Sequence, residues 1–215
     1  MKIKLCGFNE PNSLEYAVNL GCDFVGVVFV KNSIRFVEPK NSSPLSRISS
    51  QHTSKVAVVS NQNFDELLDI YNNFTPNFFQ LHGSEDPQYI SKLKNLLPMV
   101  GIIKAISINN SQDLNQVEIY QNNIDYFLFD NKNPGSGQTF DWDFLSKIKI
   151  NKPWFLSGGI NISNLETAIT KTTTQNIDIS SGIEEQRGIK SQKLIREILH
   201  KFNQIKRDQE ISKIE

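Results

Sequence analysis

Eight short runs of β-branched and aromatic residues recur along the chain at a fairly even spacing, and this repetition constrains the fold more than any other feature. Most of the runs lack apolar–polar alternation, which is typical of strands buried on both faces in a parallel sheet. The predicted strands are Lys2–Cys6, Asp23–Phe29, Lys55–Val59, Asn77–Leu81, Gly101–Ile106, Asp125–Phe129, Pro153–Leu156 and Ile177–Ile179.

Segments with helical periodicity separate these strands. Asn63 stands at the N-cap position of one predicted helix, and Asp86-Pro87 provides a cap and a proline at the first position of another. A third predicted helix covers Asn12–Leu20, with Asn12 or Ser13 as its N-cap. Further helices are predicted after Asn161 and after Ser191, with less regular ones over Pro39–Ser50, Asp113–Gln121 and Asp141–Ile148.

Strands that alternate with helices indicate βαβ units with right-handed crossovers and a parallel sheet. Eight such units favour a closed barrel over a doubly wound open sheet, which more often has five to seven strands. A length of 215 residues reaches the lower end of the range for a complete barrel. We therefore predict an α/β protein with a single (β/α)8 TIM barrel over residues 1–205 and a polar C-terminal tail over 206–215.

Composition and charge exclude several functional classes. Lys and Arg total 23, as do Asp and Glu, so no global field would attract nucleic acid or anionic lipid. No apolar run approaches the ~20 residues that a membrane helix needs, and the first residues do not resemble a signal peptide. Cys6 and Cys22 are too few and wrongly spaced for a disulfide framework or a zinc site. These features predict a cytoplasmic protein with free thiols and no metal, in which Cys22 is structural.

Two glycine-rich turns follow the seventh and eighth predicted strands: Ser157-Gly158-Gly159 and Ser180-Ser181-Gly182. A glycine at a strand end lets the backbone approach a ligand closely, and its N–H groups can then point at an anion. In a (β/α)8 barrel the loops after strands seven and eight often form a phosphate site. We therefore predict that Gly158, Gly159, Ser180, Ser181 and Gly182 bind phosphate.

Cys6 and Asp130 end the first and sixth predicted strands, where the active site of such a barrel is built. A thiol at Cys6 can act as a base or nucleophile if its pKa falls toward neutrality, although a small buried side chain is the common alternative. Asp130 follows an unusually apolar run, so its pKa should be raised, as suits a general acid. The alternative for Asp130 is a cap for the loop that follows.

Four further polar residues lie at the same end of the predicted barrel. Arg35, in the loop after the second strand, can bind a carboxylate through two parallel hydrogen bonds or remain a solvated cation. Gln80 and His82 flank Leu81, so alternation puts both on one side, although His82 could simply cap the next turn. With Asp178 at the end of the eighth strand, these are the candidate substrate-binding residues. The glycine-containing loop over 133–139 lacks the P-loop pattern and is predicted to be a lid.

Taken in order, these segments resemble the phosphoribosylanthranilate isomerases of tryptophan biosynthesis over nearly the whole chain. Five pieces carry the resemblance: Lys4-Leu5-Cys6-Gly7, Gln80-Leu81-His82-Gly83, Gly137-Gln138-Thr139-Phe140-Asp141-Trp142, Ser157-Gly158-Gly159, and Asp178-Ile179-Ser180-Ser181-Gly182-Ile183-Glu184.

The resemblance implies an aldose–ketose isomerase that performs an Amadori rearrangement without a cofactor. Its substrate would be N-(5-phosphoribosyl)anthranilate, and its product 1-(2-carboxyphenylamino)-1-deoxyribulose 5-phosphate. The resemblance also implies that Cys6 is the general base, that Asp130 is the general acid and that Arg35 binds the anthranilate carboxylate. The expected partner is this phosphorylated small molecule, with the enzyme a monomer or homodimer.

The chain departs from the family pattern at three positions. Leu5 replaces the usual isoleucine, Ile34 replaces a frequent proline, and Gln138 stands where lysine is common. Two alternatives stay open. A related phosphate-binding barrel, such as an indole-glycerol-phosphate synthase or a pentose-phosphate epimerase, would need a lysine acid or metal-binding residues at the strand ends. A non-catalytic barrel that binds a phosphorylated ligand would not need Cys6 or Asp130.

Overall fold

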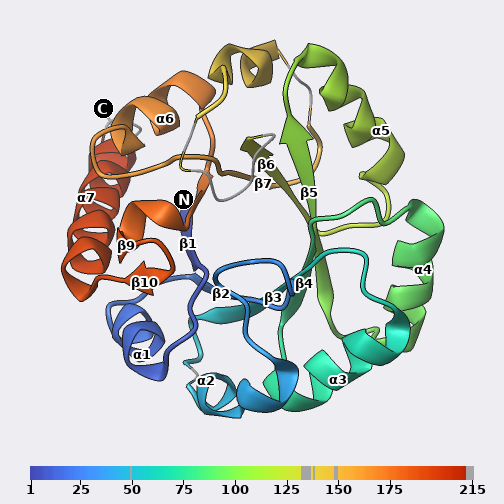
Figure 1. Ribbon diagram of the computed structural model, residues 1–215. Helices are drawn as coiled ribbons and strands as arrows, with labels where there is room; N and C mark the ends of the chain where they lie inside the picture. The colour runs from blue at the N-terminus through green and yellow to red at the C-terminus, as the bar shows by residue number, and fades with distance from the viewer. Residues whose placement is uncertain (49, 132–136, 138, 148–149, 212–215) are drawn as a thin grey trace.

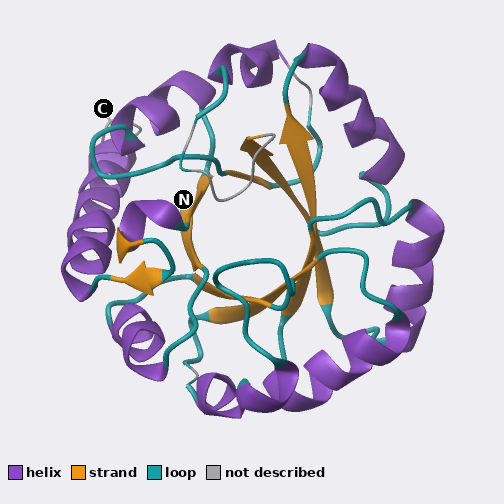
Figure 2. Ribbon diagram, viewed as in Figure 1, coloured by secondary structure: helices purple, strands orange, loops and turns teal. Residues whose placement is uncertain are grey.

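Eight parallel strands close into a barrel in sequence order, β1 to β8, and helices form a ring outside it (Figures 1 and 2). The computed structural model describes residues 1–48, 50–131, 137, 139–147 and 150–211. This confirms the predicted (β/α)8 barrel. The strands are β1 Lys2–Cys6, β2 Phe24–Val28, β3 Ser54–Val59, β4 Phe78–Leu81, β5 Gly101–Ile108, β6 Tyr126–Asn131, β7 Trp154–Leu156 and β8 Asn176–Ile179.

The barrel closes between its first and last strands. Ile3 of β1 lies opposite Ile177 of β8, and the next strands on that side pair through Leu156 with Ile177 and through Phe129 with Leu156. The carboxyl ends of β6, β7, β8 and β1 therefore form one continuous arc. That arc carries the predicted acid, both glycine turns and the predicted base.

Two predicted helix starts are confirmed by their caps. The Asn63 side chain accepts from the Glu66 N–H in a capping box, and the Asp86 carboxylate accepts from the Tyr89 N–H at 2.7 Å. The helices are α1 Pro11–Asn19, α2 Ser43–Arg47, α3 Phe64–Phe74, α4 Pro87–Leu96, α5 Gln116–Tyr120, α6 Leu165–Thr172 and α7 Gln192–Ile211, with 3-10 turns at Pro39–Asn41, Ser111–Asn115, Trp142–Lys147 and Ser181–Ile183.

Other details of the predicted helices are wrong. Helix α1 begins at Pro11 with Glu10 as its N-cap, because proline suits the first helical position; the Ser13 hydroxyl instead donates to the Glu10 carbonyl. Helix α6 begins only at Leu165, because Asn161 accepts from the Ser163 N–H in a local turn. The segment predicted as a helix from residue 141 forms a 3-10 turn.

A short hairpin, β9 Glu184–Gln186 and β10 Ile189–Lys190, was not predicted. It follows β8 and lies between β1 and α7 in Figure 1. Its strands are too short and too polar to be recognised by periodicity. The last helix, α7, continues through residues 206–211 of the predicted tail, and the division of the chain at residue 205 stays a prediction. In the described part of the chain, no helix has both the length and the apolar character needed to span a bilayer.

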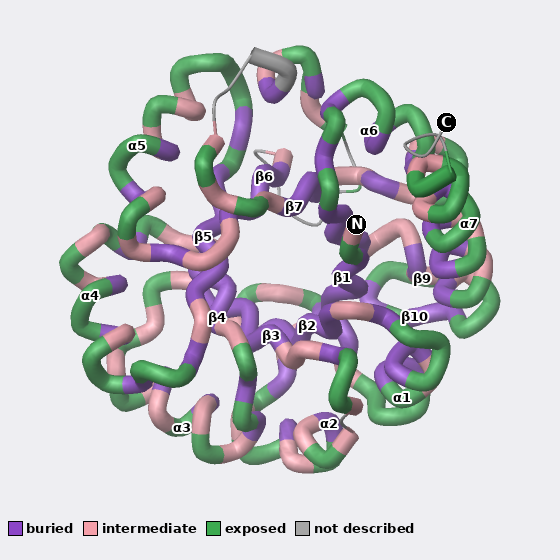
Figure 3. Tube along the Cα trace, turned by 180° about the vertical axis from the view of Figure 1, so that it is seen from behind, coloured by how far each residue is buried: buried purple, intermediate pink, exposed green. Residues whose placement is uncertain are grey.

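Side chains fill the amino-terminal half of the barrel as a packed apolar layer. We call this layer the lower layer: Phe24, Val56, Phe78, Ile103, Ala105, Tyr126, Leu128 and Phe155. The rings of Phe24 and Phe155 meet edge to face with their centroids 5.2 Å apart. Most residues of the barrel strands are buried, while exposed positions gather on the outer helices and loops (Figure 3). The lower layer forms the floor on which the other half of the barrel is built.

Candidate active site

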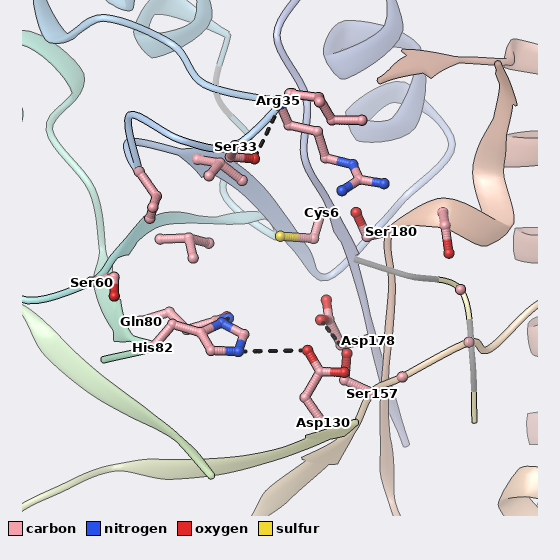
Figure 4. Close-up of a pocket in the computed structure, with 18 of the residues that line it drawn as sticks. Cys6, Ser33, Arg35, Ser60, Gln80, His82, Asp130, Ser157, Asp178 and Ser180 are labelled. Carbon is pink, nitrogen blue, oxygen red and sulfur yellow. Dashed lines mark hydrogen bonds and ion pairs between the residues drawn. The ribbon is translucent and has the colours of Figure 1, made fainter. Parts of the chain in front are cut away.

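A cavity of about 350 Å³ opens at the carboxyl ends of the strands. It is bordered by side chains from most strands of the barrel, and Cys6, His82 and Asp130 point into the same space (Figure 4). The predicted site residues thus come together, although they are spread over more than 170 positions of sequence. Those that line the cavity are Cys6, Arg35, Gln80, His82, Asp130, Gly158, Gly159, Asp178, Ser180 and Ser181.

Cys6 lies at the end of β1, almost fully buried, with its sulfur above β2. A Cβ atom on Gly26, its partner on β2, would stand 2.6 Å from the Cys6 sulfur. Gly26 therefore leaves the space that this sulfur occupies. Burial raises the pKa of the Cys6 thiol, opposed chiefly by the positive charge of Lys4. The pKa of this thiol is therefore shifted away from neutrality, opposite to the fall that would favour a base role. Cys22 is also buried, and its sulfur donates to the Phe24 carbonyl at 3.1 Å, as suits a structural thiol.

Asp130 is the carboxylate at the end of β6, and its environment favours the protonated form. Burial raises its pKa to about 7, and repulsion from Asp178 acts in the same direction. The N–H of Asn131 donates to Asp130 Oδ1 at 2.8 Å and offsets part of this effect. This confirms the predicted rise in pKa. At neutral pH the group can both give and take a proton, as a general acid must.

His82 faces Asp130 across the cavity, with Nε2 3.6 Å from Asp130 Oδ2. This is too long for a hydrogen bond. Burial, with the charge of Lys4 as the next contribution, lowers the pKa of His82 to about 4, so the ring is neutral at pH 7. Gln80 Nε2 lies 3.4 Å from His82 Nδ1, an arrangement that assigns the ring proton to Nε2. Gln80 Oε1 and His82 Nε2 are buried without a hydrogen-bond partner among the described residues.

Both glycine turns reach the edge of the cavity, and the second packs against Ile160, the residue that follows the first. Gly158 and Gly159 have φ of +86° and +67°, a backbone region that glycine adopts without strain. A Cβ on Gly158 would also lie 3.1 Å from Asp130 Oδ1, and one on Gly182 would collide with the carbonyl of Ile160. Glycine is therefore required both by backbone conformation and by close approach. Gly182 itself lies behind the cavity wall and is the predicted phosphate residue that does not line it.

Arg35 is held by an ion pair that the sequence did not predict. Its Nε and Nη2 donate to the two carboxylate oxygens of Glu184, at 2.6 and 2.8 Å. Lys190 Nζ binds the same carboxylate at 2.8 Å and the Ser180 carbonyl at 2.9 Å. Although burial opposes it, these bonds lower the pKa of Glu184 to about 2. A guanidinium group has five N–H donors, so donors remain on Arg35 for a ligand in the cavity.

Lys4 and Asp178 form a buried ion pair beneath the cavity. Lys4 Nζ donates to Asp178 Oδ1 at 2.8 Å, and the Ser157 hydroxyl donates to Asp178 Oδ2 at 3.1 Å. We predicted Asp178 as a substrate-binding residue but did not single out Lys4. Strand alternation could have found it, because Lys4 lies two positions before Cys6 and must share its face.

The predicted lid lies mostly outside the residues that the structure describes. In the predicted lid over 133–139, only Gly137 and Thr139 belong to the described residues, so Gln138 lies outside them. Among the residues that the structure describes, no group of three or more His, Cys, Asp and Glu side chains is arranged to hold a metal ion.

Residues 3–201 match the family model for N-(5'-phosphoribosyl)anthranilate (PRA) isomerase. The N-(5'-phosphoribosyl)anthranilate isomerase of Rhizobium etli is 36% identical over 202 residues, which cover 91% of this chain and 90% of the relative.

Solved structures agree. The phosphoribosyl anthranilate isomerase from Thermus thermophilus has a TM-score of 0.86 and covers 95% of this chain and all of its own; at 24% identity this likeness shows the fold. A second isomerase structure, in complex with reduced 1-(o-carboxyphenylamino)-1-deoxyribulose 5-phosphate, has a TM-score of 0.79 at 26% identity. It covers 93% of this chain and 96% of its own.

Proposed function

The chain belongs to the N-(5'-phosphoribosyl)anthranilate isomerase family and is an isomerase of tryptophan biosynthesis, and from this premise we propose how its site works. The reaction is the Amadori rearrangement of N-(5-phosphoribosyl)anthranilate to 1-(2-carboxyphenylamino)-1-deoxyribulose 5-phosphate. Asp130 is the general acid and Cys6 the general base. The observation that carries this assignment is a carboxyl group with a pKa of about 7 that shares one cavity with a cysteine at the end of β1.

Ring opening is the task of Asp130. The carboxylic acid gives its proton to the ring oxygen of the ribose while the bond from that oxygen to C1 breaks. The nitrogen lone pair forms the C1=N bond, leaving an iminium cation and a 4-hydroxyl group. A carboxyl group whose pKa lies near the working pH is suited to this step because it is protonated in a large fraction of molecules and still acidic enough to transfer the proton.

Proton removal from C2 is the task of Cys6. The iminium cation makes the C2 proton acidic, and a thiolate at Cys6 takes it. The electron pair of the C2–H bond becomes the C1=C2 double bond, while the C1=N electrons return to nitrogen. The resulting enol then becomes the C2 ketone as its 2-hydroxyl gives up a proton and C1 gains one. Positioned proton-transfer groups typically contribute about 10²–10⁴-fold each.

Three further parts of the site support this chemistry by anchoring the substrate. The glycine turns after β7 and β8 suit the phosphate, and Arg35 suits the anthranilate carboxylate with the N–H donors that Glu184 leaves free. Gln80 Oε1 and His82 Nε2 lack protein partners among the described residues and suit the sugar hydroxyls between these ends. Anchors at both ends hold C2 between acid and base.

The direct test is a fluorescence assay for the disappearance of phosphoribosylanthranilate. Initial rates of wild type, Cys6→Ser and Asp130→Asn are compared over a range of substrate concentrations that reaches saturation. Asn keeps the shape of Asp but has no proton to transfer, so we expect both variants to lose about 10²-fold or more in kcat with KM little changed. Wild-type inactivity, or full activity in either variant, would contradict the proposal.

We also propose that the enzyme acts in the cytoplasm on this free phosphorylated substrate, as a monomer or homodimer and without nucleic acid. The balance of 23 basic and 23 acidic residues supports the last point. Light scattering on purified protein, with and without added nucleic acid, measures both the oligomeric state and any association. A larger assembly or a nucleic-acid complex would contradict this part.

A further inference from the structure

Lys4 is a fully buried lysine on the inner face of β1, two residues before Cys6. Lys4 and Asp178 are register partners across the closure of the barrel between β1 and β8, and their side chains form the 2.8 Å ion pair described above. The mechanism proposed so far uses the groups above Lys4 and gives Lys4 itself no role.

Packing does not explain a charge at this position. A buried ammonium group is costly to desolvate, and a buried ion pair seldom adds more stability than apolar residues of the same volume. The barrel interior directly below is filled by the apolar side chains of the lower layer. An apolar residue at position 4 would extend that layer, so the charge points to a task connected with the cavity.

The charged groups around Cys6 come from several elements. Lys4 and Asp178 lie on β1 and β8, Lys190 on β10 and Arg35 in the loop after β2. Arg35 and Lys190 are both committed to Glu184, at 2.6 and 2.8 Å.

Across the cavity, a neutral His82 and Asp130 face the sulfur. An ammonium group has three N–H donors, and the bond to Asp178 uses one of those on Lys4. Lys4, on the same strand face as Cys6, is therefore the cation whose charge acts most strongly on the sulfur.

The electrostatic effects on Cys6 and on Lys4 both favour an ammonium–thiolate pair. Burial raises the pKa of the Cys6 thiol, and the charge of Lys4 is the largest effect that opposes it. Burial also disfavours the charge on Lys4, but attraction to Asp178 and to Cys6 outweighs it and raises the pKa of Lys4. Lys4 thus stays cationic while Cys6 titrates.

We propose that Lys4 is a positioning residue of this isomerase: its ammonium group is the counter-ion of the Cys6 thiolate, the form that removes the proton from C2. The part played in catalysis rests on the proposed function. The coupling between the two side chains does not, so it can be measured without substrate.

The test follows alkylation of Cys6 by iodoacetamide as a function of pH in wild type and Lys4→Met, with modified peptides quantified by mass spectrometry. Only the thiolate reacts, so the midpoint of the rate against pH reports the ionisation of Cys6. We expect the midpoint in Lys4→Met to rise by about one pH unit or more, which slows alkylation about tenfold at pH values below it. Lys4→Arg, which keeps the charge, should stay close to wild type.

Lys104→Met is the matched control. Lys104 is also a buried strand lysine, but it forms its ion pair with Glu85, at 3.0 Å, on the helix side of β5. We expect this variant to lower the melting temperature and leave the Cys6 midpoint unchanged. Cys22, whose sulfur bonds to carbonyl groups, serves as an unreactive internal reference.

Asp178→Asn gives a prediction of opposite sign, which keeps the inference falsifiable if Lys4→Met does not fold. Removing the carboxylate leaves the Lys4 charge with Cys6 alone, so the alkylation midpoint should fall. In steady-state kinetics, the rise of kcat/KM with pH should move upward in Lys4→Met by the same amount as the alkylation midpoint, with KM little changed.

An alkylation midpoint unchanged in Lys4→Met, or one that rises in Asp178→Asn, would overturn the inference. Failure of the proposed function has a different signature, namely a wild type that does not convert phosphoribosylanthranilate while its Cys6 titration still responds to Lys4.

Discussion

The two halves of the barrel interior are built from the same strands, but one is apolar and the other carries ionisable side chains. The lower layer is a packed cluster of aromatic and aliphatic side chains, and the upper half is the cavity with its ionisable groups. Strand β6 shows the change along a single face, from Tyr126 through Leu128 to Asp130. Strand β4 and the residue after it repeat the change, from Phe78 through Gln80 to His82.

This difference shows how one scaffold separates stability from chemistry. Apolar side chains packed at the amino-terminal ends contribute to folding through burial and contact. They also form a low-dielectric floor, beside which burial raises the pKa of Asp130 and lowers that of His82. If the division holds, substitutions below should change stability and substitutions above should change catalysis.

The largest effect on stability should come from Phe155→Ala in the lower layer. Phe155 is fully buried, and removing its ring leaves a cavity beside Phe24, so the free energy of unfolding should fall by about 3–5 kcal/mol. Urea unfolding measures this loss. The exposed Ile119→Ala is the control and should change stability by less than about 0.5 kcal/mol. A large loss of kcat in the folded variant would contradict the division between a stabilising lower layer and a catalytic upper half.

Asp130 should lower the free energy of unfolding as pH rises, because burial favours its protonated form. Its native pKa of about 7 exceeds the unfolded value of about 3.9, so between these values the native state binds more protons and stability falls with increasing pH. The contribution is fully present below about pH 4, is lost through about pH 7 and amounts to at most about 4 kcal/mol.

Urea unfolding of wild type and Asp130→Asn from pH 4.5 to 8 measures this contribution. Wild type should lose stability relative to the variant as pH rises to 7 and run parallel to it above that. Parallel curves over the whole pH range would mean that burial does not raise the pKa of Asp130.

Gly26→Ala should damage catalysis from within a strand. The added methyl group would stand 2.6 Å from the Cys6 sulfur and displace it. A displacement of about 1 Å can cost about 10²-fold, so we expect kcat to fall about a hundredfold.

Stability measurements isolate the contact between these two residues. Combining Gly26→Ala with Cys6→Ala should recover part of the stability lost in Gly26→Ala alone, with a coupling of about 0.5–3 kcal/mol. Strict additivity would show that Gly26 does not make room for the sulfur.

The smallest effect should come from Glu184→Gln at the rim. The amide keeps the shape of the carboxylate and loses the charge that holds Arg35, so we expect KM to rise about tenfold, or about 1.4 kcal/mol, with kcat nearly unchanged. Steady-state kinetics of the exposed neighbour Glu185→Gln provide the control. An unchanged KM in Glu184→Gln would show that Arg35 does not need this partner.

Much of the fold could be predicted because strands buried on both faces leave a strong local pattern. All eight barrel strands were found close to their observed bounds, and the caps at Asn63 and Asp86 were found through their side chains. The hairpin over 184–190 was missed because its strands are short and polar. The start of α1 was misplaced because the helix begins at Pro11, before the two predicted capping residues Asn12 and Ser13.

The site was predicted less evenly. Strand ends and the family resemblance indicated Cys6, Asp130 and the glycine turns, and the structure brings these into one region. The ion pairs beside them were missed, since Arg35 and Glu184 are 149 residues apart in the sequence and Lys4 and Asp178 are 174 apart. No local pattern records such pairs.

The sequence by itself determined the number and order of strands and which residues stand at their carboxyl ends, because alternation and capping depend on near neighbours along the chain. Only the tertiary structure decided the ionisation of those residues. Closing β1 against β8 brings Lys4 to Asp178, and the folded barrel buries Cys6 and Asp130. Charge and burial act through space, so the direction of each pKa shift is a property of the folded barrel.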